Sequence, residues 1–208
     1  IQTDINMLDT GSYRGLGLID FEAKKCWSGL EVKDNYVYGL TGWAFNGNGK
    51  ISDNIVISGN TMIRDDTKQY RSAYPYLFEW YSFYPKDVTI ENNYFNGGNS
   101  KLGLSCHNFY VRNNIIQNTF LRILGLYGDM IFENNSGKKK LFEISGNLPP
   151  YITDETNEAY VPENERQCNL IYRNNIGGFS ANLFSALNPN KYKYIKPIIE
   201  NNTLTYCN

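Results

Sequence analysis

A short phrase recurs seven times along this 208-residue chain, and the repetition limits the folds that the chain can adopt. In each copy two apolar residues alternate with variable ones, and Gly, Asp or Asn then precedes a final asparagine. The copies are Leu30–Asn35, Ile55–Asn60, Val88–Asn93, Phe109–Asn114, Met130–Asn135, Leu170–Asn175 and Pro197–Asn202. Apolar residues with a period of two lie on one face of a β-strand, so each copy predicts a strand that ends in a turn.

The spacing of the copies indicates a repeating coil with insertions. The final asparagines stand at 35, 60, 93, 114, 135, 175 and 202, and the shortest interval between them is 21 residues. A second apolar phrase follows several of these asparagines, for example Leu121–Ile123 and Leu141–Ile144. Each coil is therefore expected to contain at least two short strands separated by a sharp turn. No long stripe with helical spacing occurs.

Stacked coils of this kind predict an all-β fold, a parallel β-helix of about seven to eight coils in one domain over residues 1–208. The segment 1–28 is expected to form a cap or first coil, and 61–87 and 148–168 are expected to be loop insertions. The asparagine at each turn is predicted to adopt left-handed backbone and to bond its counterparts in the coils above and below. Two apolar columns form the predicted core: Leu30, Ile55, Val88, Phe109, Met130, Leu170 and Pro197, and Val32, Ile57, Ile90, Val111, Phe132, Tyr172 and Ile199.

The phrases NIVISGN, DVTIENN, NFYVRNN and NLIYRNN resemble the repeats of right-handed parallel β-helix proteins of the pectate-lyase-like superfamily. The resemblance covers about residues 29–204 and is specific for the fold rather than for an activity. That superfamily includes polysaccharide lyases, uronate epimerases, glycoside hydrolases, phage tailspikes and surface proteins. The resemblance therefore implies a secreted or surface-exposed protein, and the function has to come from the site.

The resemblance also implies a chemistry for an enzyme of this kind. In the family's lyases a positive group or Ca²⁺ neutralises a uronate carboxylate, and a Lys, Arg or His removes the C5 proton. Arg112, His107 and Arg64 are the candidate catalytic residues here, and Asp65 and Asp66 are candidate Ca²⁺ ligands. The chain shows neither a lyase signature nor the cluster of several aspartates expected of a family hydrolase.

The outward positions of the phrases form a column in which the sign of the charge alternates from Glu91 onward. Its members are Lys33, Ser58, Glu91, Arg112, Glu133, Arg173 and Glu200. Two interpretations are open. The column is a ladder of exposed ion pairs that fixes the register, or it is a polar groove in which Glu91, Arg112 and Arg173 bind an acidic sugar.

The other outward column is apolar in its C-terminal half, with Tyr110, Ile131, Ile171 and Ile198. Exposed apolar stripes usually mark a covered or partnered surface. We expect a loop such as 148–167, a covering domain or a second copy of the chain to pack there. Tyr110 is also a candidate substrate-binding residue.

The predicted insertion 61–87 is rich in aromatic and charged residues. Tyr74 and Trp80 are candidates for stacking against sugar rings, and the alternative is that these aromatics pack against the flank of the β-helix. His107 is the only histidine in the chain, so sites built from several histidines are excluded. A single histidine is more often structural than catalytic.

Charge and composition exclude several classes of partner. The net charge of −1 gives no reason to expect a nucleic-acid partner. The chain contains no run of 18 apolar residues, so no membrane span is predicted.

The chain begins at Ile1, so a processed protein or a fragment is expected. The four cysteines (Cys26, Cys106, Cys168 and Cys207) form no CxxC pair; buried free thiols are favoured, and disulfides stay open. The leading hypothesis is a protein that binds an acidic polysaccharide, with cleavage or epimerisation of that polysaccharide left open; its rival is a non-catalytic structural or adhesive shaft.

Overall fold

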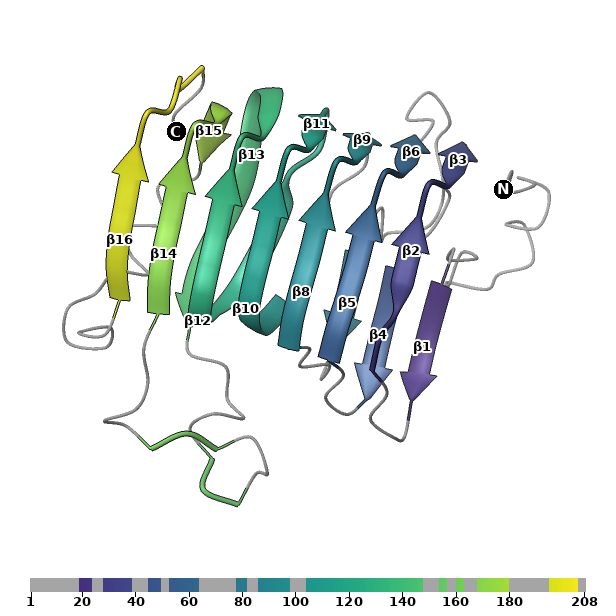
Figure 1. The fold of residues 1–208 in the computed structure, drawn as a ribbon, viewed down its shortest axis with the longest axis vertical. Coiled ribbons are helices and arrows are strands. Elements are labelled where there is room, and N and C mark those ends of the chain that lie inside the picture. Colours follow the sequence, from purple (N-terminus) through teal and green to yellow (C-terminus); the bar gives the residue numbers. More distant parts are fainter. Residues whose placement is uncertain are drawn as a thin grey trace, which may run out of the picture.

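The computed structural model is built from parallel β-strands, and it contains no helix among the residues that it describes (Figure 1). Those residues are 19–23, 28–38, 45–49, 53–63, 78–81, 86–97, 104–147, 154–156, 160–162, 168–179 and 195–205. Within them, no element is a helix that could cross a membrane. The all-β, parallel class predicted from the repeats is confirmed.

The strands of the seven phrases lie side by side in chain order and form what we call the front sheet. It contains β2 (Glu31–Lys33), β5 (Asp53–Ser58), β8 (Lys86–Glu91), the ends of β10 (Leu104–Arg112) and β12 (Leu121–Glu133), β14 (Cys168–Arg173) and β16 (Ile195–Glu200). Each pairs in parallel with the next, as stacked coils require.

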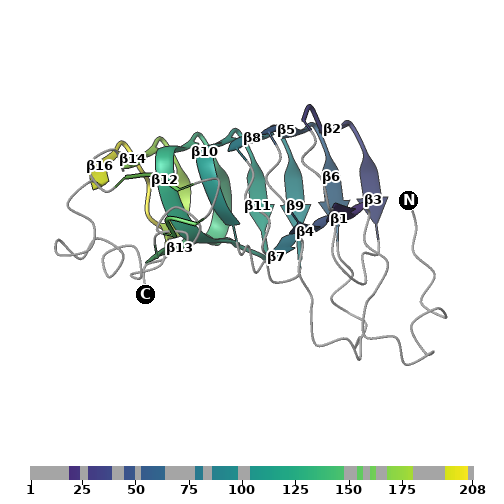
Figure 2. The same cartoon turned by 90° about the horizontal axis from the view of Figure 1, so that it is seen from below.

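The chain turns after each front strand and forms a second row of parallel strands. This row holds β3 (Tyr36–Tyr38), β6 (Thr61–Ile63), β9 (Tyr94–Asn96), β11 (Ile115–Gln117), the start of β13 (Ser136–Asn147) and β15 (Ile176–Phe179). A third row contains β1 (Ile19–Ala23), β4 (Phe45–Gly49) and β7 (Phe78–Tyr81), and the start of β12 pairs with the end of β13. Seen from below, the front sheet runs along one side of the stack, and β1, β4, β7 and β13 lie on the other (Figure 2).

Two details of the predicted organisation can be compared with these rows. The segment Leu141–Asn147, expected to be the second strand of its coil, is the end of β13, and it pairs with β12 as predicted. The range 61–87, expected to be a loop insertion, contains β6 and β7 and the first residues of β8. Of the predicted insertion 148–168, residues 154–156 and 160–162 are described, together with Cys168 at the start of β14.

The strand register confirms the alignment of the phrases. Val32 pairs with Ile57, Ile57 with Ile90, and the same column continues through Val111, Phe132, Tyr172 and Ile199. The predicted core residues are buried in both columns from β5 to β14. Pro197 and Ile199 were predicted to be core but are exposed, because β16 pairs only with β14 among the described strands.

Asparagine side chains form a continuous ladder along the turn that follows the front sheet. The Nδ2 group of each donates to the Oδ1 atom of the next, at 2.9 to 3.1 Å, from Asn35 through Asn60, Asn93, Asn114, Asn135 and Asn175 to Asn202. The backbone N–H of each donates to the same Oδ1 atom. The ladder predicted from the repeats is confirmed.

In these turns the left-handed backbone conformation is adopted by a different residue from the one that we predicted. It is the residue before each ladder asparagine that has a positive φ: Asp34, Gly59, Asn92, Asn113, Asn134, Asn174 and Asn201. Asn, Asp and Gly are the residues that adopt this conformation most readily, which explains the composition of the fifth position of the phrase. The turn thus uses two residues: the first adopts the left-handed backbone, and the side-chain amide of the second makes the hydrogen bonds between coils.

We predict that Asn114→Ala lowers the free energy of unfolding by about 3 kcal/mol or more, because the main-chain N–H and Nδ2 of Asn93 lose a buried acceptor. Asn35→Ala is the matched control. Asn35 is only partly buried and accepts no ladder bond from a described residue, so a loss of about 1 kcal/mol is expected. Urea denaturation of both variants measures the difference. Equal losses would mean that the ladder does not stabilise the interior of the stack.

Candidate binding face

The outer face of the front sheet carries three rows of side chains that run across the strands. The central row is Val56, Thr89, Tyr110, Ile131, Ile171 and Ile198, which are paired in register. Two residues later on each strand lies the charged row: Ser58, Glu91, Arg112, Glu133, Arg173 and Glu200. Two residues earlier lies what we call the amide row: Asn54, Asp87, Asn108, Asp129 and Asn169.

The charged row contains two ion pairs between neighbouring strands. Arg112 Nε lies 2.6 Å from Glu91 Oε2, and Arg173 Nη2 lies 2.7 Å from Glu133 Oε2. The predicted lateral pairing of alternating charges is thus present in these two pairs. Both arginine side chains are more than 40% exposed, so each pair contributes only about 0 to 1 kcal/mol to stability. The ion pairs therefore fix the side chains more than they stabilise the fold.

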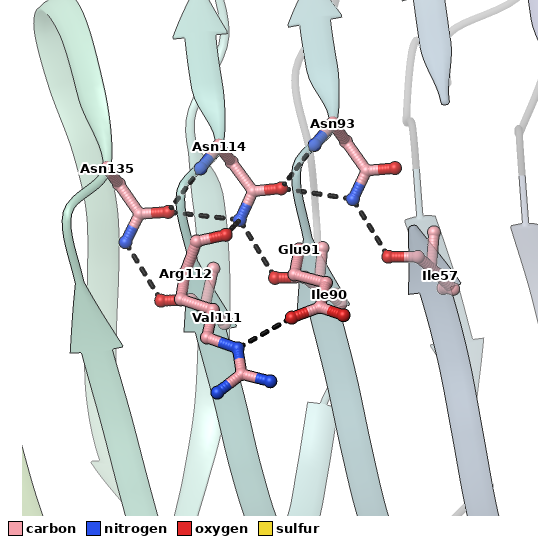
Figure 3. Close-up of polar contacts among 8 residues, drawn as sticks. All are labelled: Ile57, Ile90, Glu91, Asn93, Val111, Arg112, Asn114 and Asn135. Carbon is pink, nitrogen blue, oxygen red and sulfur yellow. Dashed lines mark hydrogen bonds and ion pairs between the residues drawn. The ribbon is translucent and has the colours of Figure 1, made fainter. Parts of the chain in front are cut away.

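The two arginines use their guanidinium groups differently. Arg173 presents both Nε and Nη2 to the same oxygen of Glu133, at 2.8 and 2.7 Å. Arg112 contacts Glu91 through Nε alone, and in Figure 3 no hydrogen bond or ion pair joins its two terminal nitrogens to Glu91. Within the described residues neither terminal nitrogen of Arg112 has a further partner. Its outer edge can therefore donate two parallel hydrogen bonds to a planar anion such as a carboxylate.

The amide row was missed by the sequence analysis. Asn108 Nδ2 donates to Asp87 Oδ1 at 2.7 Å, and the main-chain N–H of Asp129 donates to Asn108 Oδ1 at 3.0 Å. Asn169 Nδ2 donates to Asp129 Oδ1 at 2.8 Å, which extends the row to β14. The available signal was an Asn or Asp one residue before the phrase, and this residue has a positive φ at Asn54, Asp87 and Asn108.

His107 lies at the amide-row end of the sheet, on β10. It pairs with Lys86 in the register, and Lys86 pairs in turn with Asp53. A β-carbon at Gly128 would lie 2.5 Å from the His107 Cδ2 atom, so the glycine makes room for the imidazole. Desolvation lowers the pKa of His107, with a smaller opposing effect of Asp87 and a further lowering by Lys86. The imidazole is therefore held preferentially in its neutral form.

Tyr110 stands between His107 and Arg112 on the same strand, in the central row. Partial burial raises the pKa of its hydroxyl, and the nearby carboxylates of Asp129 and Asp87 raise it further. The phenol is therefore protonated at neutral pH and can donate a hydrogen bond. Tyr110 thus offers an aromatic ring and a donor in the middle of the face.

The structure places only some of the predicted site residues close together. Arg112 contacts Glu91 and shares the outer face with Tyr110 and Arg173. His107 and Arg112 are five residues apart on one strand, a separation of roughly 16 Å at the usual rise of a strand. These two candidate catalytic residues therefore do not converge on one point.

The remaining predicted site residues lie where the structure gives no side-chain information. Arg64, Asp65, Asp66 and Tyr74 lie outside the described residues, and Trp80 is placed only by the backbone of β7. Among the residues that are described, no group of three or more His, Cys, Asp or Glu side chains is arranged to hold a metal ion. The Ca²⁺ ligands Asp65 and Asp66 stay a prediction.

The segment expected to cover the central row does not do so in its described part. Residues 154–156 and 160–162 lie beyond the lower ends of the strands rather than over the outer face (Figures 1 and 2). Tyr110, Ile131 and Ile171 are half-buried, and Ile198 is 47% exposed. The central row is thus accessible on the sheet.

Among the four cysteines, Cys168 is the one whose side chain the structure describes. It is a buried free thiol, as predicted. Burial raises its pKa to about 12, with a smaller contribution from Asp129, so the thiol is protonated and unreactive at neutral pH.

Comparisons of the chain with protein-family models, with curated proteins and with solved structures gave no match. The candidate function accordingly depends on the geometry of the outer face.

We predict that His107 makes the folded state sensitive to mild acid. The pKa of His107 in the folded state lies below the ordinary histidine value of 6.5, so the unfolded state binds a proton first as the pH falls. The free energy of unfolding should therefore decrease between about pH 7.5 and pH 5 more steeply for the native chain than for His107→Gln. Urea denaturation at several pH values measures this. Since His107 is the only histidine, parallel curves for the two proteins would contradict the prediction.

Proposed function

We propose that the stack is a right-handed parallel β-helix of about seven to eight coils, related in architecture to the pectate-lyase-like superfamily. Parallel strands joined by crossovers within a sheet are right-handed in nearly all proteins. The asparagine ladder and the three rows of parallel strands support this proposal. The superfamily relationship rests on the repeat phrases alone.

We further propose that the outer face of the front sheet binds an extended acidic polysaccharide, on a secreted or surface-exposed protein. The three rows provide complementary groups for such a chain: an apolar centre with Tyr110, guanidinium groups on one side, and amides and carboxylates on the other. A linear polymer lying across the strands would meet the same set of groups at each strand spacing of about 4.8 Å. A surface whose groups recur at each strand therefore fits a ligand that is itself a repeating polymer.

The observation that carries the proposal is the outward edge of Arg112. Its terminal nitrogens make no hydrogen bond or ion pair with another described residue, while Nε is held at 2.6 Å from Glu91 Oε2. The ion pair thus orients the guanidinium before a ligand arrives, which reduces the entropy lost on binding. A uronate carboxylate is a planar acceptor that fits two parallel N–H groups. Glu91 serves in this proposal as the residue that positions Arg112.

The geometry favours binding without cleavage. A lyase or epimerase step needs carboxylate neutralisation and proton removal on the same sugar residue. Arg112 and His107 are too far apart to act together on one sugar, although the neutral imidazole of His107 is suited to accept a proton. Arg64, Asp65 and Asp66 stay candidates for a separate Ca²⁺-dependent site.

Arg112→Gln should weaken the affinity for a polyuronate by about tenfold, because two charge-assisted hydrogen bonds are lost. Arg173→Gln is the matched control: it changes the net charge equally and breaks an equivalent ion pair, but its Nε and Nη2 already bind Glu133. We expect it to weaken binding less than about threefold. Titration calorimetry with a polyuronate, and with a neutral glucan for comparison, measures both affinities. Equal losses in the two variants would reduce the effect to net charge and contradict the proposal.

A second candidate function is that of a non-catalytic shaft or adhesin that assembles through the central row. The accessible row of Tyr110, Ile131 and Ile171 favours it, since contiguous apolar surface is often buried in assemblies. Under this alternative Ile131→Asp should convert an oligomer to a monomer in sedimentation. Ile115→Asp is the control, because Ile115 is 43% exposed but lies on β11, away from the front sheet. An unchanged oligomer in the Ile131 variant would exclude assembly through this row.

A further inference from the structure

The ion pairs of the charged row repeat every two strands rather than every strand. Glu91 on β8 pairs with Arg112 on β10, and Glu133 on β12 pairs with Arg173 on β14. Within the described residues no ion pair joins Arg112 to Glu133, so this part of the row consists of two separate units. Neighbouring strands lie about 4.8 Å apart, so equivalent groups of the two units recur after about 9.6 Å.

The amide row has the same period of two strands. Asn108 Nδ2 donates to Asp87 Oδ1 at 2.7 Å, and Asn169 Nδ2 donates to Asp129 Oδ1 at 2.8 Å. The two rows are also in phase. Both place acidic side chains on β8 and β12, and both place donor side chains, a guanidinium and an amide, on β10 and β14. The unit that recurs along this part of the outer face is therefore a pair of strands.

This alternation restricts where a bound polymer can carry negative charge. A ligand carboxylate held by Arg112 on β10 lies between two acidic strands, and each of these carries a glutamate in the charged row and an aspartate in the amide row. One strand spacing is shorter than the screening length of about 8 Å at physiological ionic strength. A further ligand carboxylate over β8 or β12 would therefore be repelled, since like charges across an interface are unfavourable.

The next favourable position for a carboxylate lies two strands from Arg112, on β14. The side chain of Arg173 is 41% exposed there, and it offers a weaker contact than Arg112 because its Nε and Nη2 already bind Glu133. The position between the two arginines, over β12, favours a group without negative charge. Hydroxyl groups fit it, because they can donate to the carboxylates of Glu133 and Asp129.

We propose that the outer face selects a polymer with a disaccharide repeat, in which each uronate alternates with an uncharged sugar. This inference rests on the proposed binding of an acidic polysaccharide and names the class of polymer. Two pyranose rings of an extended chain have about the length of two strand spacings, so successive uronates meet β10 and β14 and the uncharged sugars meet β8 and β12. A homopolymer of uronates would instead place every second carboxylate over an acidic strand.

Two hexasaccharides built from the same uronate separate the two classes of polymer. The hyaluronan hexasaccharide alternates glucuronate with N-acetylglucosamine, and a β-linked oligoglucuronate hexasaccharide carries a carboxylate on every sugar. In titration calorimetry we expect the native chain to bind the hyaluronan hexasaccharide about tenfold more tightly, because the homopolymer adds charge repulsion. An oligoglucuronate affinity that equals or exceeds the hyaluronan affinity overturns the inference.

Glu133→Gln tests the cause of this preference. Loss of the carboxylate on β12 removes part of the repulsion, so the preference for hyaluronan should fall from about tenfold to about threefold or less. Glu143→Gln is the matched control. It changes the net charge equally and also breaks an ion pair, with Lys140, but it lies on β13 outside the front sheet, so the preference should stay the same. An unchanged preference in the Glu133 variant contradicts selection by alternating charge.

Arg112→Gln distinguishes a failure of this inference from a failure of the proposed function. If this variant weakens the binding of both hexasaccharides while the native chain binds them equally well, the face recognises uronates without selecting a disaccharide repeat. If the variant weakens the binding of neither, the proposed recognition of an acidic polysaccharide by Arg112 is wrong, and the inference that rests on it is wrong as well.

Discussion

The asparagine ladder is the interaction on which the rest of the structure depends. The Nδ2 group of Asn114 donates to Asn135 Oδ1 and also to the carbonyl of Ile90, which belongs to the preceding coil. Figure 3 shows the same arrangement at Asn93 and Asn135, whose amides reach the carbonyls of Ile57 and Val111. Each amide therefore ties three successive coils together inside a buried turn. A shift of one residue in any coil would break these bonds and leave buried donors without acceptors.

The ladder explains why so much of the fold could be predicted from the sequence. Its geometry requires an asparagine at one position and Asn, Asp or Gly just before it, so the register of the front sheet is written into every copy of the phrase. The amide row was harder to predict, because its signal is a single Asn or Asp outside the phrase. The identity of the left-handed residue was assigned wrongly, since both positions are occupied by residues that tolerate positive φ.

Other features depend on contacts between coils rather than on the pattern within one coil. Arg112 and Arg173 occupy equivalent positions and face equivalent glutamates, yet one uses Nε alone and the other uses both Nε and Nη2. No sequence pattern distinguishes them. The exposure of Pro197 and Ile199 likewise follows from the absence of a second partner strand for β16 among the described strands, although their residue types match the core column.

A fixed register also determines where the protein can interact with other molecules. Inside the stack every strand has two neighbours, so its backbone groups are used and only its outward side chains remain available. The outer face can therefore recognise a ligand through rows of side chains, and repetition along the stack favours a repeating polymer. Only an edge strand can recognise a partner through its backbone.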